Sequence, residues 1–171
     1  MASAERIAQL GQVVLFRGLT EEALVLIAAI AEEEDHHVAH VIFRQGETGE
    51  KLYVIVSGRV RISRDVGGMG EEALAILGPG SCFGEMALVD DSPRSADAHV
   101  HEKCRLLSIP KEAFEELLFL HKDLAYEVLW STVRILTARL RDTNDKITFL
   151  STTTRFLRRG VVRCSSRFSS Q

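Results

Sequence analysis

The first part of the chain has the apolar spacing of helices. Residues 3–34 are predicted to be helical. Within them, Thr20 is placed to cap a helix that begins with Glu21 and Glu22, because a hydroxyl accepts from the first free amides and acids there favour the helix dipole. The apolar face of this helix consists of Ala23, Leu24, Leu26, Ile27 and Ile30.

From about residue 37 the hydrophobic period changes to two. In the segment 57–63, Val60 and Ile62 alternate with Arg59 and Arg61, which predicts a half-buried strand. Short apolar runs with glycines nearby are also predicted strands: 38–43, 52–56 and 73–77. The runs 97–101 and 105–109 complete the series. Many short strands separated by glycine turns predict a small antiparallel β-roll or jelly roll.

Two helices follow the predicted sheet, which Pro110 ends. They cover residues 111–120 and about 123–150. Apolar residues of the second helix alternate in steps of four and three, with one polar member: Leu129, Val133, Leu136, Leu140, Thr143, Ile147 and Leu150. This seam favours a parallel two-stranded coiled coil over the alternative, a single amphipathic helix packed on the roll.

The predicted architecture is therefore α+β. N-terminal helices occupy residues 1–34, the β-roll 35–110, and a short helix with a long dimerisation helix 111–150. A Ser/Arg-rich tail covers 151–171. Its five arginines and lack of acids favour either a solvated terminus or a contact with nucleic acid.

Composition narrows the class of protein. The chain has 171 residues, is 46% hydrophobic and carries a net charge of −3, as expected for one ordinary globular domain with an appendage. Its cysteines are Cys82, Cys104 and Cys164, an odd set without CxxC spacing, so we expect no disulfide or zinc site and a reducing cytoplasm. We find no signal peptide and no apolar run of the roughly 20 residues that a membrane span needs.

The segment 80–96 carries the most informative chemistry. Gly84 allows close backbone approach, and Glu85–Leu88 can form one helical turn whose amides face an anion. Arg94 offers a donor fork suited to phosphate, Ser95 adds a hydroxyl, and Glu85 can accept from a sugar hydroxyl or orient Arg94. This inventory matches a ribose joined to a phosphodiester. The alternative for Arg94 is a surface ion pair with Asp90 or Asp91.

The residues FGEMALVDDSPRSA, 83–96, resemble the phosphate-binding cassette of the cyclic-nucleotide-binding domain family. The resemblance extends from about residue 15 to 150. It implies that Glu85 accepts from the ribose 2′-hydroxyl and that Arg94 and Ser95 hold the cyclic phosphate. The amides of Gly84, Met86 and Ala87 would line the pocket.

Residues 137–147 resemble the dimerisation helix of the family's cyclic-AMP receptor (catabolite activator) branch. In that branch a Thr and a Ser, one from each subunit, read the adenine. Thr143 matches the Thr and Asn144 replaces the Ser, so the resemblance implies a second half of the site here. A polar seam residue that only sets the helix register is the alternative.

The expected function is a cyclic-nucleotide sensor that dimerises and changes the packing of its long helices when ligand binds. Cyclic AMP is preferred over cyclic GMP, because Ser rather than Thr follows Arg94 and because Thr143 matches the adenine reader. We expect no enzyme, since no nucleophile–base–acid set is present. We also expect no metal site at five of the six histidines, His36, His37, His40, His99 and His101.

The resemblance also implies a helix-turn-helix domain after the long helix, and residues 151–171 are too few to build one. DNA binding is therefore not expected of this chain alone, and any protein partner is unknown. Three hypotheses stay open: a stand-alone sensor, the sensory part of a transcription regulator whose DNA-binding domain is missing, and a ligand-free structural dimerisation module.

Overall fold

The computed structural model describes residues 4–67, 70–88 and 92–165. The chain divides into two compact units, residues 1–132 and 133–171. The first unit begins with α1 (Ala4–Gln12), the 3-10 turn η1 (Val14–Phe16) and α2 (Glu21–Ile30). Thr20 caps α2 as predicted, its hydroxyl accepting from the Ala23 amide at 3.3 Å.

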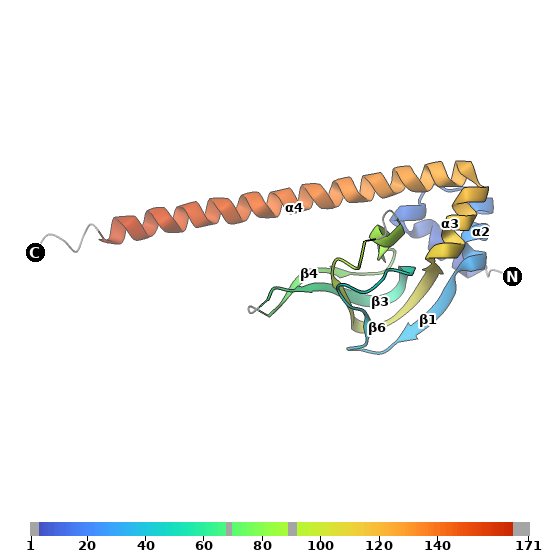
Figure 1. Cartoon of the computed structure of the whole chain (residues 1–171), viewed down its shortest axis with the longest axis horizontal. Coiled ribbons are helices and arrows are strands. Elements are labelled where there is room, and N and C mark those ends of the chain that lie inside the picture. Colours follow the sequence, from blue (N-terminus) through green and yellow to red (C-terminus); the bar gives the residue numbers. More distant parts are fainter. Residues whose placement is uncertain (1–3, 68–69, 89–91, 166–171) are drawn as a thin grey trace, which may run out of the picture. The chain divides into compact units, whose positions relative to one another are not determined.

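A six-stranded antiparallel sheet follows these helices (Figure 1). Its strands are β1 (Glu32–His36), β2 (Val41–Phe43), β3 (Lys51–Asp65), β4 (Glu71–Leu77), β5 (Cys82–Phe83) and β6 (Asp97–Pro110). The order is β1-β6-β3-β4, with β2 paired to β6 and β5 paired to β3. The β-roll with flanking N-terminal and C-terminal helices is confirmed as the fold class.

Strands β3 and β6 are each longer than predicted. The sequence predicts a break between residues 56 and 57, and another between 101 and 105, yet each strand runs through. The register between β3 and β6 shifts three times between Ile55 and Val60. Gly58 lies within this irregular stretch with φ +82°. A glycine inside a strand therefore marks a bend here, not an end.

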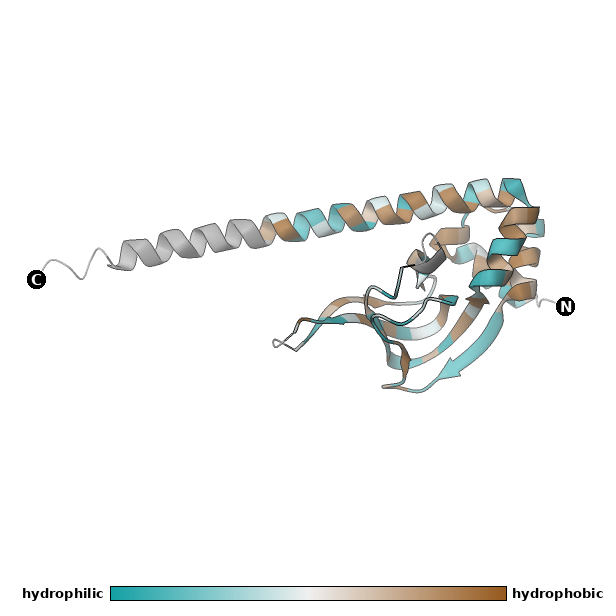
Figure 2. Ribbon diagram, viewed as in Figure 1, coloured by the Kyte–Doolittle hydropathy of each residue, from teal (hydrophilic) through white to brown (hydrophobic). Residues whose placement is uncertain are grey.

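The prediction of helix up to residue 34 is wrong at its end, because β1 begins at Glu32. This edge strand is hydrophilic along its length (Figure 2). Its acids have partners distant in the sequence: Glu33 pairs with Arg6 at 3.0 Å, and Asp35 with Arg105 at 3.6 Å. Strand pairing with β6 and these ion pairs override the helical preference of glutamate.

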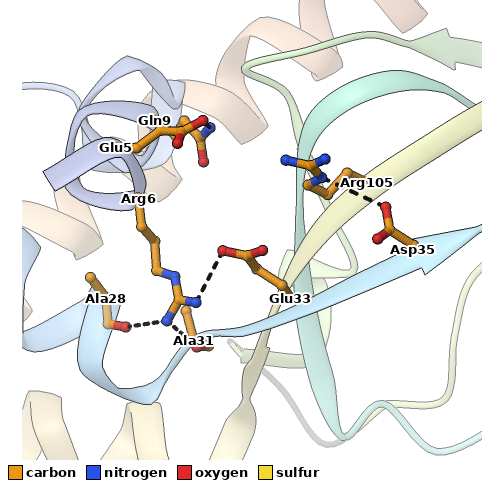
Figure 3. Close-up of polar contacts among 8 residues, drawn as sticks. All are labelled: Glu5, Arg6, Gln9, Ala28, Ala31, Glu33, Asp35 and Arg105. Carbon is orange, nitrogen blue, oxygen red and sulfur yellow. Dashed lines mark hydrogen bonds and ion pairs between the residues drawn. The ribbon is translucent and has the colours of Figure 1, made fainter. Parts of the chain in front are cut away.

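Arg6 joins α1, α2 and β1 (Figure 3). Its guanidinium donates to the carbonyl oxygens of Ala28 at 3.3 Å and Ala31 at 3.1 Å, and to the Glu33 carboxylate at 3.0 Å. The last carbonyls of a helix lack partners within the helix. Arg6 thus caps the C-terminus of α2 and fixes where the chain turns into β1.

The apolar core has two parts. Inside the roll, strands β3, β5 and β6 bury one cluster: Tyr53, Ile55, Val60, Phe83, Ala98, Val100, Cys104 and Leu106. Between the helices and the sheet, Phe16 meets Phe114 edge-on, with ring centroids 6.1 Å apart. Phe114 belongs to α3 (Lys111–Leu120), which lies beside α2 at one end of the sheet (Figure 1) and confirms the predicted short helix.

The long helix α4 covers Lys122–Ser165 and is longer than the predicted 123–150. It begins in the first unit and continues through the second. The structure does not describe the side chains beyond residue 149. A solvated terminus and a contact with nucleic acid therefore both stay predictions for the basic tail. In the described part of the chain, no helix is long and apolar enough to cross a membrane.

Candidate nucleotide site

The cassette begins where β5 ends. Gly84 has φ +77°, and a Cβ added there would lie 2.5 Å from Nη1 of Arg94 and 3.2 Å from the Lys51 carbonyl oxygen. Glycine is therefore required by both its backbone conformation and the close approach of Arg94. The 3-10 turn η2 (Glu85–Leu88) follows, which confirms the predicted single helical turn.

The backbone of Arg94 is fixed by the turn that follows β2. The Arg94 amide donates to the Glu47 carbonyl oxygen at 2.8 Å, and the Arg94 carbonyl accepts from the Gly46 amide at 2.9 Å. Two segments that are far apart in the sequence thus hold each other. The base of the Arg94 side chain has a fixed position before any ligand binds.

The Arg94 guanidinium is buried and held at two points. Only 7% of the residue is exposed. Nη1 donates to the Gly84 carbonyl oxygen at 3.1 Å and Nη2 to the Lys51 carbonyl oxygen at 2.7 Å. The guanidinium carbon also lies 4.1 Å from the centre of the Phe43 ring, a cation–π geometry.

One donor of this group has no acceptor among the residues that the structure describes. Arg94 Nε is buried, and among the described residues no atom accepts a hydrogen bond from it. Burial lowers the pKa of Arg94, while the charges of Tyr53 and Glu85 oppose that effect. An arginine keeps its proton at neutral pH even so. A buried cation with a free donor is costly unless an acceptor reaches it, which points to an anion.

Glu85 and Ser95 lie in the same cassette but differ in burial. Glu85 is only 2% exposed, so its carboxylate sits inside the site beside the positive charge of Arg94. Ser95 is exposed, and its hydroxyl donates to the Met86 sulfur at 3.6 Å. Sulfur is a weak acceptor, so this hydroxyl can turn to a stronger one. Ala87 is described by its backbone in η2 alone.

The alternative interpretation of Arg94 as a surface ion pair does not fit its burial. The proposed partners of that pair, Asp90 and Asp91, lie outside the described residues. Thr143 and Asn144 belong to the second unit, where α4 carries both as exposed residues. The Thr143 hydroxyl donates to the Arg139 carbonyl at 2.8 Å. Their part in a nucleotide site stays a prediction.

Several residues that hold Arg94 were not found from the sequence. Phe43, Tyr53 and Phe83 form an aromatic cluster next to it, with the Tyr53 and Phe83 rings stacked at 5.2 Å. Lys51 contributes a backbone carbonyl, which no side-chain motif reveals. The only signal available in the sequence is Phe43 at the end of one predicted strand and Tyr53 inside another, since Phe83 lies in no predicted strand.

Several histidines lie next to acidic residues. His36 stacks on His40 and pairs with Glu34, and His99 lies 3.7 Å from Glu71. In the part of the chain that the structure describes, no three His, Cys, Asp or Glu side chains gather closely enough to hold a metal ion.

Comparison with known proteins agrees with the geometry of the cassette. A family model described as "Cyclic nucleotide-binding domain" matches residues 34–121. A CRP-like cAMP-activated global transcriptional regulator from Mycobacterium tuberculosis is 30% identical over 133 residues, which are 78% of this chain and 58% of that protein. This chain therefore spans less than two thirds of that regulator's length.

Two solved structures show the same fold with appreciable identity. The catabolite activator protein of Thermus thermophilus superposes with a TM-score of 0.70 and 35% identity, over 81% of this chain and 63% of the other. The regulatory domain of Toxoplasma gondii PKA, crystallised with cAMP, gives a TM-score of 0.62 and 29% identity, over 66% and 42%. With the cassette geometry and the family match, these findings show that the chain belongs to the cyclic nucleotide-binding domain family.

Proposed function

We propose that this chain is a sensory module that binds cyclic AMP at Arg94. The observation that carries the proposal is the buried Nε of Arg94, a donor on a cation with no acceptor among the described residues. A cyclic phosphate offers the matching acceptor and charge. Ser95 and the amides of Gly84, Met86 and Ala87 would complete the phosphate contacts, and Glu85 would accept from the ribose 2′-hydroxyl.

Cyclic AMP is proposed over cyclic GMP on two grounds. Ser95, not a threonine, follows Arg94, and Thr143 with Asn144 can present a donor and an acceptor to an adenine edge. The Mycobacterium regulator is described as cAMP-activated, whereas a cGMP-dependent protein kinase of Caenorhabditis elegans is 30% identical over 111 residues. The names of these relatives include both nucleotides, and titration of this chain with each one measures its base preference.

A thermal shift tests binding directly. Ligand that binds only the folded chain stabilises it by about 2.7 kcal/mol at a hundred times Kd, which raises Tm by several degrees. We expect this rise with cyclic AMP, a smaller one with cyclic GMP at the same concentration, and none with adenosine, which lacks the phosphate. An unchanged Tm with both cyclic nucleotides would contradict the proposal.

We further propose that α4 forms a dimer through its apolar seam. Four apolar seam residues are exposed in the single chain: Leu129, Val133, Leu140 and Ile147. Leu140 is the most exposed of these four residues, at 61%. Apolar residues in strict steps of four and three are buried when two such helices pair. The side chain of Leu150, the last seam position, lies outside the described part.

Leu140→Asp is expected to convert the dimer to a monomer, because a charge would be buried at the centre of the seam. Sedimentation velocity measures this: wild type should show twice the chain's mass of 19.0 kDa, and the variant the single mass. Ala138→Asp, also exposed on α4 but off the seam, is the matched control and should stay dimeric. A monomeric wild type, or a dimer in both variants, would contradict dimerisation through the apolar seam of α4.

A second candidate is the sensory part of a longer transcription regulator. It is favoured by coverage, since this chain matches only 58% of the Mycobacterium regulator and 63% of the Thermus structure. In that case the α4 pair would pass the ligand signal to a further domain. An immunoblot of source cells with an antibody against this chain decides between the two: a polypeptide clearly above 19.0 kDa supports the regulator.

A further inference from the structure

Lys51, the first residue of β3, contacts Arg94 through its backbone carbonyl and two acidic residues of β1 through its side-chain ammonium. Its carbonyl oxygen accepts from Arg94 Nη2 at 2.7 Å. Its ammonium donates to the Glu34 carboxylate at 2.9 Å and lies 3.6 Å from that of Glu32. One residue therefore connects the phosphate-binding arginine to the edge strand β1.

Strand pairing explains why the Lys51 carbonyl serves Arg94. β5 pairs with β3 at only two positions, Tyr53 with Phe83 and Val54 with Cys82. The ladder ends before it reaches Lys51. Arg94 then bridges the Lys51 carbonyl and the Gly84 carbonyl, the residue just after β5. The guanidinium takes the place of backbone donors at the end of this strand pair, so its orientation depends on how the Lys51 peptide is held.

The other end of Lys51 is anchored firmly. Glu34 also contacts His36 Nε2 at 3.0 Å, and its strand is paired with β6 along five residues. The hydrogen bond that the Lys51 ammonium donates to Glu34 raises the pKa of Lys51. Burial acts to raise the pKa of Glu34, but its hydrogen bonds outweigh burial and lower it. Both groups are therefore charged at neutral pH, and both are partly buried.

We propose that Lys51 and Glu34 form a positioning pair that fixes the Arg94 guanidinium for the phosphate of the ligand. The inference rests on the proposed function, because it assigns a role within that same site. Neither side chain needs to touch the nucleotide. Their ion pair holds the first peptide of β3, and that peptide's carbonyl holds Arg94.

Glu34→Gln separates this role from simple attraction. If Lys51 acted only as a nearby positive charge, removing the negative Glu34 would leave more positive potential and tighten cyclic AMP binding. A positioning pair predicts the opposite, a loss of about threefold to fivefold, in line with a partly exposed ion pair. Lys51→Met should show the same loss, and Lys51→Arg, which can still reach Glu34, should bind close to wild type.

The experiment is a calorimetric titration of each purified full chain with cyclic AMP. Arg105→Met is the matched control, since it breaks another ion pair of β1, with Asp35, that does not involve Arg94. Lys51→Met is also measured in an Arg94→Lys background, where the bond from Nη2 no longer exists. There its effect should fall to less than twofold, whereas a general loss of structure would weaken both backgrounds equally.

Each outcome decides one statement. A wild-type chain that binds no cyclic nucleotide overturns the proposed function and this inference with it. Wild-type binding together with unchanged or tighter binding by Glu34→Gln overturns the positioning pair alone. Equal losses in both Arg94 backgrounds, or a loss in Arg105→Met as large as in Lys51→Met, also overturn it.

Discussion

Arg94→Ala is expected to weaken cyclic AMP binding by at least about thirtyfold, from the 2–5 kcal/mol that truncating one partner of a buried charge pair costs. The reason is geometric as well as electrostatic. The guanidinium is almost completely buried, the Arg94 backbone is hydrogen-bonded to Gly46 and Glu47, and no described residue accepts a hydrogen bond from Nε. Titration of the variant with cyclic AMP measures the loss.

Two variants keep this prediction specific. Arg94→Lys retains the charge without the fork and should lose less, about tenfold, because an ammonium binds phosphate as a point charge. Arg59→Ala removes an equal charge from β3, where Arg59 pairs with Glu102 on the exposed surface, and should bind like wild type. Binding by Arg94→Ala within a few fold of wild type would remove Arg94 from the site.

Gly58→Ala is expected to destabilise the fold more than any other single methyl group added to a described glycine. The added Cβ would lie 2.2 Å from the Lys103 carbonyl oxygen and 2.7 Å from the Cys104 Cα. Both are backbone atoms of β6 and cannot turn away. Together with φ +82°, we expect a cost of about 3 kcal/mol or more and a drop in Tm of about 10 °C.

Gly18→Ala is the matched control for Gly58→Ala. Gly18 also has a left-handed backbone, with φ +94°, but an added Cβ would meet no atom within 4 Å. Only the conformational strain of about 1–2 kcal/mol should appear there. Thermal unfolding monitored by circular dichroism compares the two. Equal melting temperatures would mean that β3 and β6 do not approach each other at Gly58 as closely as described.

The sequence was sufficient for elements whose signals are local. Thr20 with its following acids predicted the start of α2, and Pro110 with the next ten residues predicted α3. Sequence-based prediction is wrong where contacts between distant segments determine the secondary structure. Residues 32–34 are predicted as the end of a helix, yet ion pairs with Arg6, Lys51 and Arg105 hold the acids of β1 in a strand. Gly58 follows the predicted strand 52–56 as a boundary, yet β3 runs through it, because glycine occurs both where a strand bends and where it ends.

The candidate site divides in the same way. Gly84, Glu85 and Arg94 were predicted because their chemistry lies within one short segment of the chain. Phe43 and the Lys51 carbonyl were not, since their contacts with Arg94 join residues that only the folded sheet brings together. A backbone carbonyl in particular leaves no mark on residue identity.

Isothermal titration of the chain, after removal of any co-purified nucleotide, tests the central claim most directly. We predict saturable binding of one cyclic AMP per chain, weaker binding of cyclic GMP, and no binding of adenosine at the same concentrations. The absence of binding heat with both cyclic nucleotides, repeated at a second temperature to exclude a zero enthalpy, would contradict the account.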